Sequence, residues 1–313
     1  MLFRSVKLPL ATWQDWRVAV PKLKAAGYAP LAMDNFEVGI IWTFRSIGDQ
    51  LLDKYFERWN TFKNDGTPGT AKQLTYKAYT RIFKSGVNVA KLPEMTATLQ
   101  LMKEVFNNVT PNWSGIKPTT GAAVNIKDFL AGKAAMAWGL NFAVSEVLDT
   151  KPGFKVGSSG WPTITRTTTP TSSGAPARFG LAPGGTSYMI PATTTGDKLS
   201  AAINFLQFIT SPKYNQPWLT ASAGASAIKG VKAIPAINGF GEGRWGESPR
   251  VQIDRLAYLS PQSQKEFIQI MQGYLLGSSN LTDTQNALQA SWVKAAEYQL
   301  SQNPEWKSEA WAK

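Results

Sequence analysis

The chain has 313 residues, of which 43% are hydrophobic, so it can bury a substantial core in roughly one to three domains. It contains no histidine and no cysteine. This excludes Ser-His-Asp and Cys-His catalysis, zinc sites built from these residues, and disulfide bonds. The net charge is +12, but the basic residues are spread singly, without a run or a recognition motif. We therefore expect a solvated basic surface and no nucleic-acid partner.

The sequence also lacks features of membrane proteins and of cofactor enzymes. No stretch of about 18 apolar residues occurs, so no transmembrane span is predicted. Residues 1–11 contain no apolar core of a signal peptide. The glycine-rich stretch 182–188 is not followed by the Gly-Lys-Ser/Thr of a phosphate loop. We predict no cofactor and no metal.

The first predicted element is a helix after Thr12, a good N-cap with Asp15 three residues on. Its apolar residues recur at helical spacing: Trp13, Trp16, Val20 and Leu23. Gly27 is expected to end it. A buried strand is predicted at 28–33, followed by a long helix over 40–59, a turn at 64–70, and helices around 71–84 and 94–108.

The second half continues the alternation of helix and strand. A helix, a turn at Gly132, a strand over 134–138 and a further helix are predicted in 125–148. From about residue 152, Gly, Pro, Ser and Thr dominate, which indicates either a linker or a segment that changes domain. A strand at 187–192, a helix at 197–210, an irregular region at 212–250 and a helical tail at 251–313 follow. The fold class predicted is α/β.

Four blocks of the sequence resemble one protein family. They are TWQDWRVAVPKLKAAGYAPLAM (12–33), DFLAGKAAMAWGLNF (128–142), LAPGGTSYMIPATTTGDKLSAAINFLQFITSPKYNQPW (181–218) and SAIKGV (226–231). Each is similar to a block of the family 1 extracellular solute-binding proteins, the sugar receptors of bacterial ABC importers. The blocks follow the family's order and spacing from residue 7 onward.

The resemblance implies a periplasmic-binding-protein-like, two-lobed fold of type II, rich in helix, with the first part of the N-terminal lobe missing. Residues 6–155 would form the second lobe, with the C-terminal helices of 232–313 packed on it. Residues 156–231 would be the returning part of the first lobe. That part is expected to expose apolar surface, and the 313 residues alone are expected to bind sugar weakly or not at all. Residues 1–5 are interpreted as an artefact, because Leu-Phe-Arg-Ser matches a translated sequencing adapter.

The function implied is capture of a sugar or oligosaccharide between two lobes and its delivery to the membrane subunits of an ABC permease. Such a protein would be a monomer and not an enzyme. It would be extracellular or periplasmic, or a lipoprotein at the cell surface. One alternative is a carbohydrate-active hydrolase, which needs two carboxylates about 5–10 Å apart across a cleft. Asp34, Glu37 and Asp49 are near one another in sequence, but no recognisable acid/base motif surrounds them. The less favoured alternative is a basic nucleic-acid-binding protein.

The first candidate site is WGLNF, residues 138–142, where a predicted strand meets a helix. Ligands bind at the carboxyl ends of strands in open α/β sheets. By resemblance, Phe142 occupies the position of the family's sugar-stacking aromatic, which is usually Trp. Asn141 is predicted to hydrogen-bond a sugar hydroxyl. Trp138 is a further candidate ligand, although a core role is the more economical interpretation.

The second candidate site follows the predicted strand at 28–33. Asp34, Asn35 and Glu37 would lie at its carboxyl end, where carboxylates suit sugar hydroxyls. Helix capping by Asp34 or Asn35 is an equal alternative. Trp42 is a candidate stacking residue, with core packing as its alternative.

Two further positions complete the predicted site. Gly184, Gly185 and Thr186 offer backbone N–H groups that a ligand can approach closely, or else a turn that enters a strand. On the first helix of the tail, Phe267 and Tyr274 lie near a position where the family often has an aromatic residue of the cleft. For Phe267 and Tyr274, core packing is the default expectation.

Overall fold

The structure is a computed structural model that describes most of the chain. The described residues are 6, 8–60, 72–115, 126–180, 188–224, 226, 228–241 and 244–312, with the side chain of Phe142 excepted. The expectations for residues 1–5 and for the turn at 64–70 lie outside them. None of the helices in these ranges is both long and apolar enough to span a membrane.

Helix α1 (Trp13–Ala25) begins and ends where the sequence predicts. The Thr12 hydroxyl accepts from the Asp15 amide at 3.3 Å, and the Asp15 carboxylate accepts from the Thr12 amide at 2.8 Å. This reciprocal cap satisfies two backbone donors that a helix start otherwise leaves free. The four apolar residues predicted for its inner face are all buried. Gly27 follows at a φ of +85°, which suits glycine.

Two short parallel strands form the sheet among the described residues. Strand β1 (Ala29–Ala32) pairs with β2 (Ala134–Ala137), with Leu31 opposite Met136. About a hundred residues separate the strands, and helices fill this connection, as parallel pairing requires. Two of the three predicted strands are therefore confirmed, and each leads into one of the two candidate sites.

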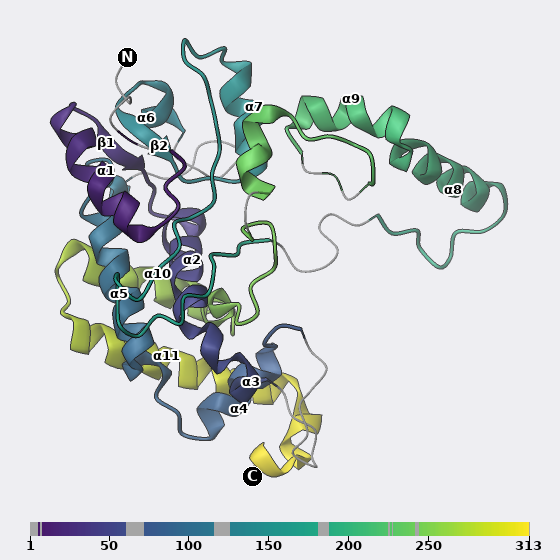
Figure 1. Ribbon diagram of the computed structural model, residues 1–313. Helices are drawn as coiled ribbons and strands as arrows, with labels where there is room; N and C mark the ends of the chain where they lie inside the picture. The colour runs from purple at the N-terminus through teal and green to yellow at the C-terminus, as the bar shows by residue number, and fades with distance from the viewer. Residues whose placement is uncertain are drawn as a thin grey trace.

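Helices make up most of the structure, which supports the α/β, helix-rich fold class (Figure 1). The longer ones after α1 are α2 (Thr43–Leu52), α4 (Tyr76–Lys84), α5 (Pro93–Phe106), α7 (Asn141–Asp149), α8 (Gly196–Thr210), α9 (Pro212–Ser222), α10 (Ser263–Leu276) and α11 (Leu281–Gln302). The short ones are η1 (Glu37–Trp42), η2 (Asp53–Tyr55), α3 (Phe56–Trp59), η3 (Val89–Lys91), η4 (Trp113–Gly115), α6 (Lys127–Leu130), η5 (Pro235–Gly241), η6 (Ile253–Leu256), η7 (Pro304–Ser308) and η8 (Ala310–Ala312).

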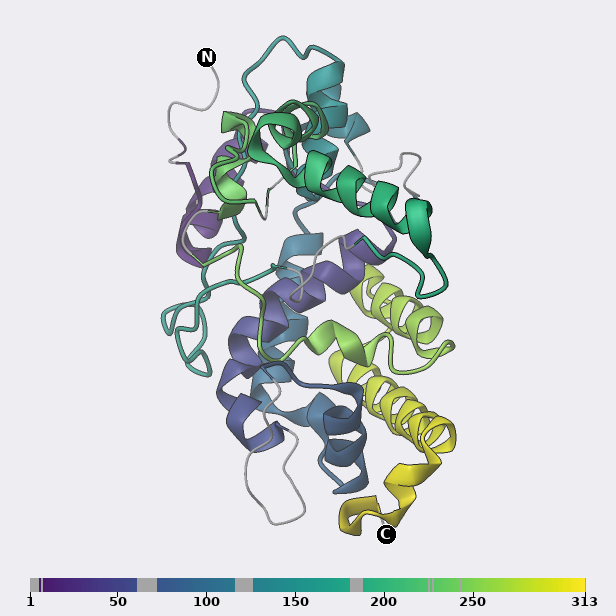
Figure 2. The same cartoon turned by 90° about the vertical axis from the view of Figure 1, so that its right-hand side faces the viewer.

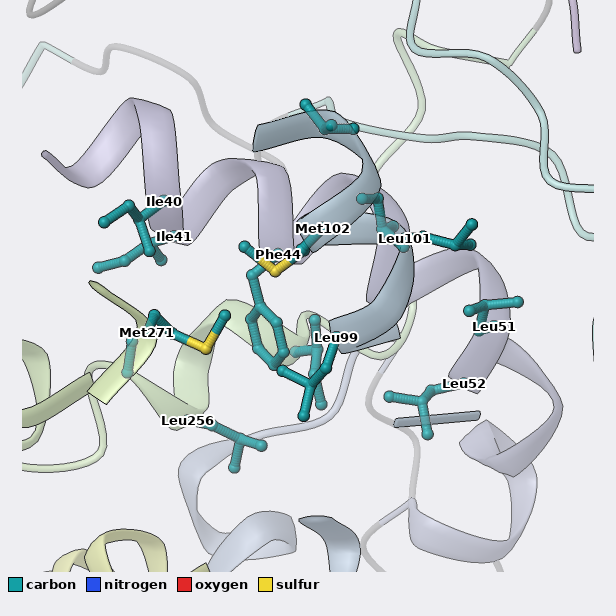
Figure 3. Packing of buried hydrophobic residues seen from close by; sticks show 14 of the residues in the cluster. Ile40, Ile41, Phe44, Leu51, Leu52, Leu99, Leu101, Met102, Leu256 and Met271 are labelled. Atoms are coloured by element: carbon teal, nitrogen blue, oxygen red, sulfur yellow. The ribbon is translucent and has the colours of Figure 1, made fainter. Parts of the chain in front are cut away.

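The long helix predicted over 40–59 is divided in the structure. It begins as the π-helical turn η1, continues as α2, and passes through the 3-10 turn η2 into α3. Every residue of α2 is buried, because α2 lies between α5, α10 and η6. Figure 3 shows Phe44, Leu99 and Met271 in the hydrophobic cluster that joins these elements. We call the elements that share this cluster the helical body.

Helices α8 and α9 extend away from the helical body, with α9 next to α7 (Figure 1, Figure 2). No residue of α8 is buried. Large apolar side chains are exposed here, among them Met189, Ile203, Phe205, Phe208 and Trp218. The expectation that residues 156–231 expose apolar surface is confirmed in this part, which we call the α8–α9 arm (residues 188–222).

One predicted strand is wrong. Residues 188–192 have no strand structure, and Tyr188 and Met189 are 57% and 89% exposed. The apolar pattern of this segment is suited to a buried strand. However, a strand needs a neighbour to accept its backbone hydrogen bonds, and none of the described residues pairs with this segment.

Candidate functional site

The turn after β1 carries Asp34, one of the predicted ligand residues. Asp34 is 2% exposed, and its Oδ1 accepts from the Phe36 amide at 3.0 Å. A Cβ at Gly39 would lie 2.2 Å from the Asp34 carbonyl oxygen, so glycine is required for η1 to close against this turn. This bond closes a local turn just before η1, whose own N-cap residue, Phe36, makes no side-chain capping bond. The role of Asp34 as a ligand stays a prediction.

The two polar residues that follow are joined to the C-terminal part of the chain. Asn35 donates to the Ser114 carbonyl and accepts, through Oδ1, from the side chain of Gln272 on α10. Glu37 accepts from the hydroxyl of Tyr258 through Oε1. We call Asn35, Glu37, Tyr258 and Gln272 the polar cluster. It sits at a π-helical turn, a local distortion that is frequent at functional sites.

The sequence interpretation missed Tyr258 and Gln272. Tyr258 is 221 positions from Glu37, and Gln272 is 237 positions from Asn35, so no local spacing connects them. The weak signal available was the expected cleft aromatic near the start of the tail, which pointed to Phe267 and Tyr274. Both are almost fully buried, and Phe267 packs on Phe44 with ring centroids 4.9 Å apart, so their default core role is confirmed.

Tyr258 is electrostatically tied to this cluster. Burial, and secondarily the hydrogen bond to Glu37, raise the pKa of Tyr258 well above its ordinary value. The hydroxyl therefore keeps its proton and donates to Glu37 over the whole physiological range. The half-buried Trp42 opposes this rise in the pKa of Tyr258, which places Trp42 beside the polar cluster.

Trp138 lies in a group of aromatic rings. It is 7% exposed, and its indole N–H donates to the Val38 carbonyl at 2.8 Å. Its ring lies 5.1 Å from Trp161, 5.4 Å from Phe179 and 6.0 Å from Trp245, centroid to centroid. Trp42 lies 5.3 Å from Phe179. We call these five rings the aromatic cluster. Trp138 is placed inside it, as its core interpretation expects.

The residues after β2 begin helix α7. The side-chain amide of Asn141 donates to the Ala223 carbonyl at 3.3 Å, which joins the start of α7 to the residue after α9. Phe142 is the next residue of α7, but its side chain lies outside the described atoms, so its predicted stacking role stays a prediction. Gly184, Gly185 and Thr186 also lie outside the described residues.

The three carboxylates of the hydrolase alternative have separate surroundings. Asp34 caps its own turn and Glu37 binds Tyr258, while Asp49 of α2 is 5% exposed and accepts from the Ile253 amide at 2.8 Å. Burial, followed by the charge of Asp254, raises the pKa of Asp49 to about 8. Within the described ranges, no group of three or more acidic side chains is arranged to hold a metal ion.

Solved structures that share this fold include RafE, MsmE and BL01359. RafE in complex with raffinose has a TM-score of 0.59 at 20% identity, covering 94% of this chain and 68% of RafE. The apo form of RafE from Streptococcus pneumoniae has the same TM-score at 19% identity, covering 94% and 67%. MsmE of Bacillus subtilis, in an open conformation, has a TM-score of 0.60 at 17% identity, covering 94% and 67%. Sugar transporter BL01359 of Bacillus licheniformis, in complex with stachyose, has a TM-score of 0.57 at 12% identity, covering 94% and 69%.

These matches identify the class as the α/β solute-binding-protein fold, and the chain spans about two thirds of the length of each of the three proteins. The family described as bacterial extracellular solute-binding protein matches residues 8–239. The chain therefore belongs to the bacterial extracellular solute-binding proteins. A search of curated proteins gave no match.

Proposed function

We propose that this protein is the sugar- or oligosaccharide-binding component of an ABC importer. The observation that carries the proposal is the polar cluster beside Trp42, in a chain that belongs to a solute-binding family. The ligands named for RafE and BL01359, raffinose and stachyose, indicate the chemical class. The protein would bind its ligand and pass it on to permease subunits without chemical turnover.

The polar cluster has the hydrogen-bonding capacity that sugar hydroxyls need. Glu37 uses Oε1 for Tyr258, and a carboxylate has further lone pairs that can accept from hydroxyls in charge-assisted bonds. The amides of Asn35 and Gln272 each carry one N–H beyond the bond described. Trp42 and, by resemblance, Phe142 would supply the apolar faces on which the C–H side of a sugar ring stacks.

The organisation of the whole protein is also part of the proposal. Residues 6–155 and 232–313 would form one lobe and residues 156–231 would belong to the other, with Gly184, Gly185 and Thr186 contributing backbone donors. Extracellular or periplasmic location follows from the family, and attachment to the cell surface as a lipoprotein is the finer form of that proposal. The protein would work as a monomer that docks on the permease.

Saturation-transfer NMR with raffinose, stachyose and chitooligosaccharides tests the function, because it detects weak as well as tight binding. We expect saturation of the sugar-ring protons. In a titration, Glu37→Gln should weaken binding about tenfold by removing the charge from one hydrogen bond. Glu104→Gln is the matched control, since Glu104 pairs with Arg17 on the surface.

Two other results would have separate meanings. Release of monosaccharides, followed by chromatography, would contradict the non-enzymatic proposal and favour the hydrolase alternative. Absence of binding to every sugar in the panel would contradict the proposal that these 313 residues hold a working sugar site, and would match the expectation of weak or absent binding. Micromolar affinity would support the function and contradict only the expectation of weak binding by these 313 residues.

A further inference from the structure

Two chain segments lie side by side between the helical body and the α8–α9 arm. The outgoing segment, residues 175–180, comes before the arm in sequence, and the returning segment, residues 244–250, comes after it. The Phe179 amide donates to the Trp245 carbonyl at 2.8 Å, and the Gly180 amide donates to the Glu247 carbonyl at 2.8 Å. A Cβ at Gly180 would lie 2.0 Å from the Gly246 carbonyl oxygen, so only glycine allows this close approach.

Arg45 of α2 reaches the outgoing segment from inside the helical body. It is 4% exposed, and its Nη2 donates to the carbonyls of Phe179 at 3.2 Å and Gly180 at 3.1 Å. Its guanidinium carbon lies 4.5 Å from the centroid of the Phe179 ring. One buried side chain thus holds both the backbone and the ring of the outgoing segment.

Asp254 accepts a hydrogen bond from this guanidinium, and Asp49 lies beside it. Nη1 lies 3.5 Å from Asp254 Oδ2 on η6, and Nε lies 3.8 Å from Asp49 Oδ2 one helical turn along α2. All three side chains are at least nine-tenths buried. The group spans α2, η6 and the outgoing segment, which are far apart in sequence.

The ring that Arg45 holds is central to the aromatic cluster. Phe179 stacks on Trp245 of the returning segment at 5.2 Å and contacts Trp42 and Trp138, two of the predicted ligand residues. A shift of the outgoing segment would therefore move the surface against which both tryptophans pack. Because packed clusters deform little without loss of contact, the position of Phe179 constrains theirs.

We propose that Arg45 is a positioning residue for the sugar site, which fixes the outgoing segment at Phe179 and Gly180 and thereby the aromatic cluster behind Trp42. The proposal rests on the proposed function only where it concerns sugar. The rival explanation is that surface ion pairs hold the segments. Asp53 pairs with Arg178 of the outgoing segment at 3.6 Å and with Arg250 of the returning segment at 2.7 Å.

The test compares Arg45→Met/Asp254→Asn with the wild-type chain by hydrogen exchange of peptides that cover 175–180. The double variant removes the donors without leaving Asp254 as an unpaired buried charge. We expect exchange there to become about tenfold faster or more, with α11 unchanged. Arg17→Met, the same substitution at an exposed ion pair, is the matched control and should change nothing in 175–180. If 175–180 exchanges in the double variant at the wild-type rate, the proposal is overturned, and the Asp53 ion pairs become the better explanation of what holds the segment.

Arg45→Lys separates positioning from a structural role. Lysine keeps the charge, but its three N–H donors sit on one nitrogen and cannot reproduce the separate Nη1 and Nη2 positions from which Arg45 reaches Asp254 and the two carbonyls. We expect Arg45→Lys to have the thermal midpoint of the wild-type protein, while hydrogen exchange in 175–180 stays faster than in the wild type. Restoration of both would overturn the proposal, because charge alone would then suffice.

The sugar titration of the double variant should give a dissociation constant about tenfold weaker than wild type. Faster exchange with unchanged affinity would overturn the link to the sugar site. Wild-type protein that binds no sugar would instead contradict the proposed function, and the exchange measurements would still decide the role of Arg45 in the segment.

Discussion

Helices α2 and α8 are both rich in apolar residues, yet their surroundings are opposite. Every residue of α2 is buried, including Arg45 and Asp49, whereas α8 buries none and exposes Ile203, Phe205 and Phe208. The difference lies in the neighbours: α2 has α5, α10 and η6 around it, while α8 packs on α9. Burial of a helix thus depends on partners elsewhere in the chain and not on its own composition.

The largest expected effect is the difference in stability between variants in which one phenylalanine is truncated in α2 or in α8. Phe44→Ala in α2 should lower the free energy of unfolding by about 3–5 kcal/mol, because it leaves a cavity in a closely packed cluster. Phe205→Ala in α8, at a side chain 57% exposed, should change it by less than about 0.5 kcal/mol. Urea unfolding measures both. Equal losses would show that the arm is packed as tightly as the body.

The second prediction concerns pH and the buried charges of the body. The pKa of Asp49 is raised to about 8 in the folded protein, from an ordinary value near 4. Between these values the folded state binds a proton that the unfolded state has released. The stabilisation that protonation of Asp49 contributes is therefore fully present below about pH 4. Between about pH 4 and pH 8, the free energy of unfolding falls by up to about 1.4 kcal/mol per pH unit.

Asp49→Asn tests this pH dependence directly. The asparagine oxygen can still accept from the Ile253 amide, but it does not titrate. Urea unfolding at intervals from pH 5 to pH 8 should show a shallower fall in stability for the variant. The raised pKa of Asp254 acts in the same direction, so part of the slope should remain. Identical slopes in variant and wild type would contradict the prediction.

The third prediction compares two threonine N-cap residues, Thr12 and Thr195. Thr12 accepts from the Asp15 amide at the start of α1, whereas Thr195, before α8, makes no side-chain capping bond. Thr12→Ala should therefore cost about 1 kcal/mol of stability and Thr195→Ala close to nothing. Thermal unfolding of the two variants measures the difference. A larger loss at Thr195 would reverse the interpretation.

The smallest effect on stability is expected on the exposed face of the arm. Ile203→Ser/Phe205→Ser removes two exposed apolar side chains and should leave the free energy of unfolding within about 0.5 kcal/mol of wild type. The same change should lower the fluorescence of a bound hydrophobic dye, because less apolar surface remains in water. Val18→Ser, an exposed apolar position on α1, is the control. Unchanged dye fluorescence would show that the dye binds to apolar surface outside Ile203 and Phe205.

Much of the helical body was predictable, because its signals are local. Helix α1, its cap and its four inward residues follow from spacing within a few turns, and β1 and β2 follow from short apolar runs. The long helix over 40–59 was predicted as one element, but its start is a π-helical turn that closes against Asp34. Such a change of helix type depends on a close backbone approach that periodicity does not report.

The candidate site was predicted on one side only. Asn35, Glu37 and Trp42 were proposed as site residues because they follow a strand, whereas Tyr258 and Gln272, which bond to Glu37 and Asn35, come from distant elements. Arg45 was missed altogether, since its apolar neighbours on α2 indicate only a buried helix face. The carbonyls that it holds come from a segment without regular structure.

The sequence by itself determined α1 and most of the other long helices, strands β1 and β2, the N-cap at Thr12 and the exclusion of histidine and cysteine chemistry, because these depend on residue type and on neighbours within one or two turns. Helix α9 (Pro212–Ser222) is an exception, because it lies in the region 212–250 that was predicted to be irregular. Tertiary structure alone decided that residues 188–192 form no strand, that α8 stays exposed, and that Glu37 meets Tyr258. These outcomes depend on which distant segments are present to accept a hydrogen bond or cover an apolar face, and no local pattern carries that information.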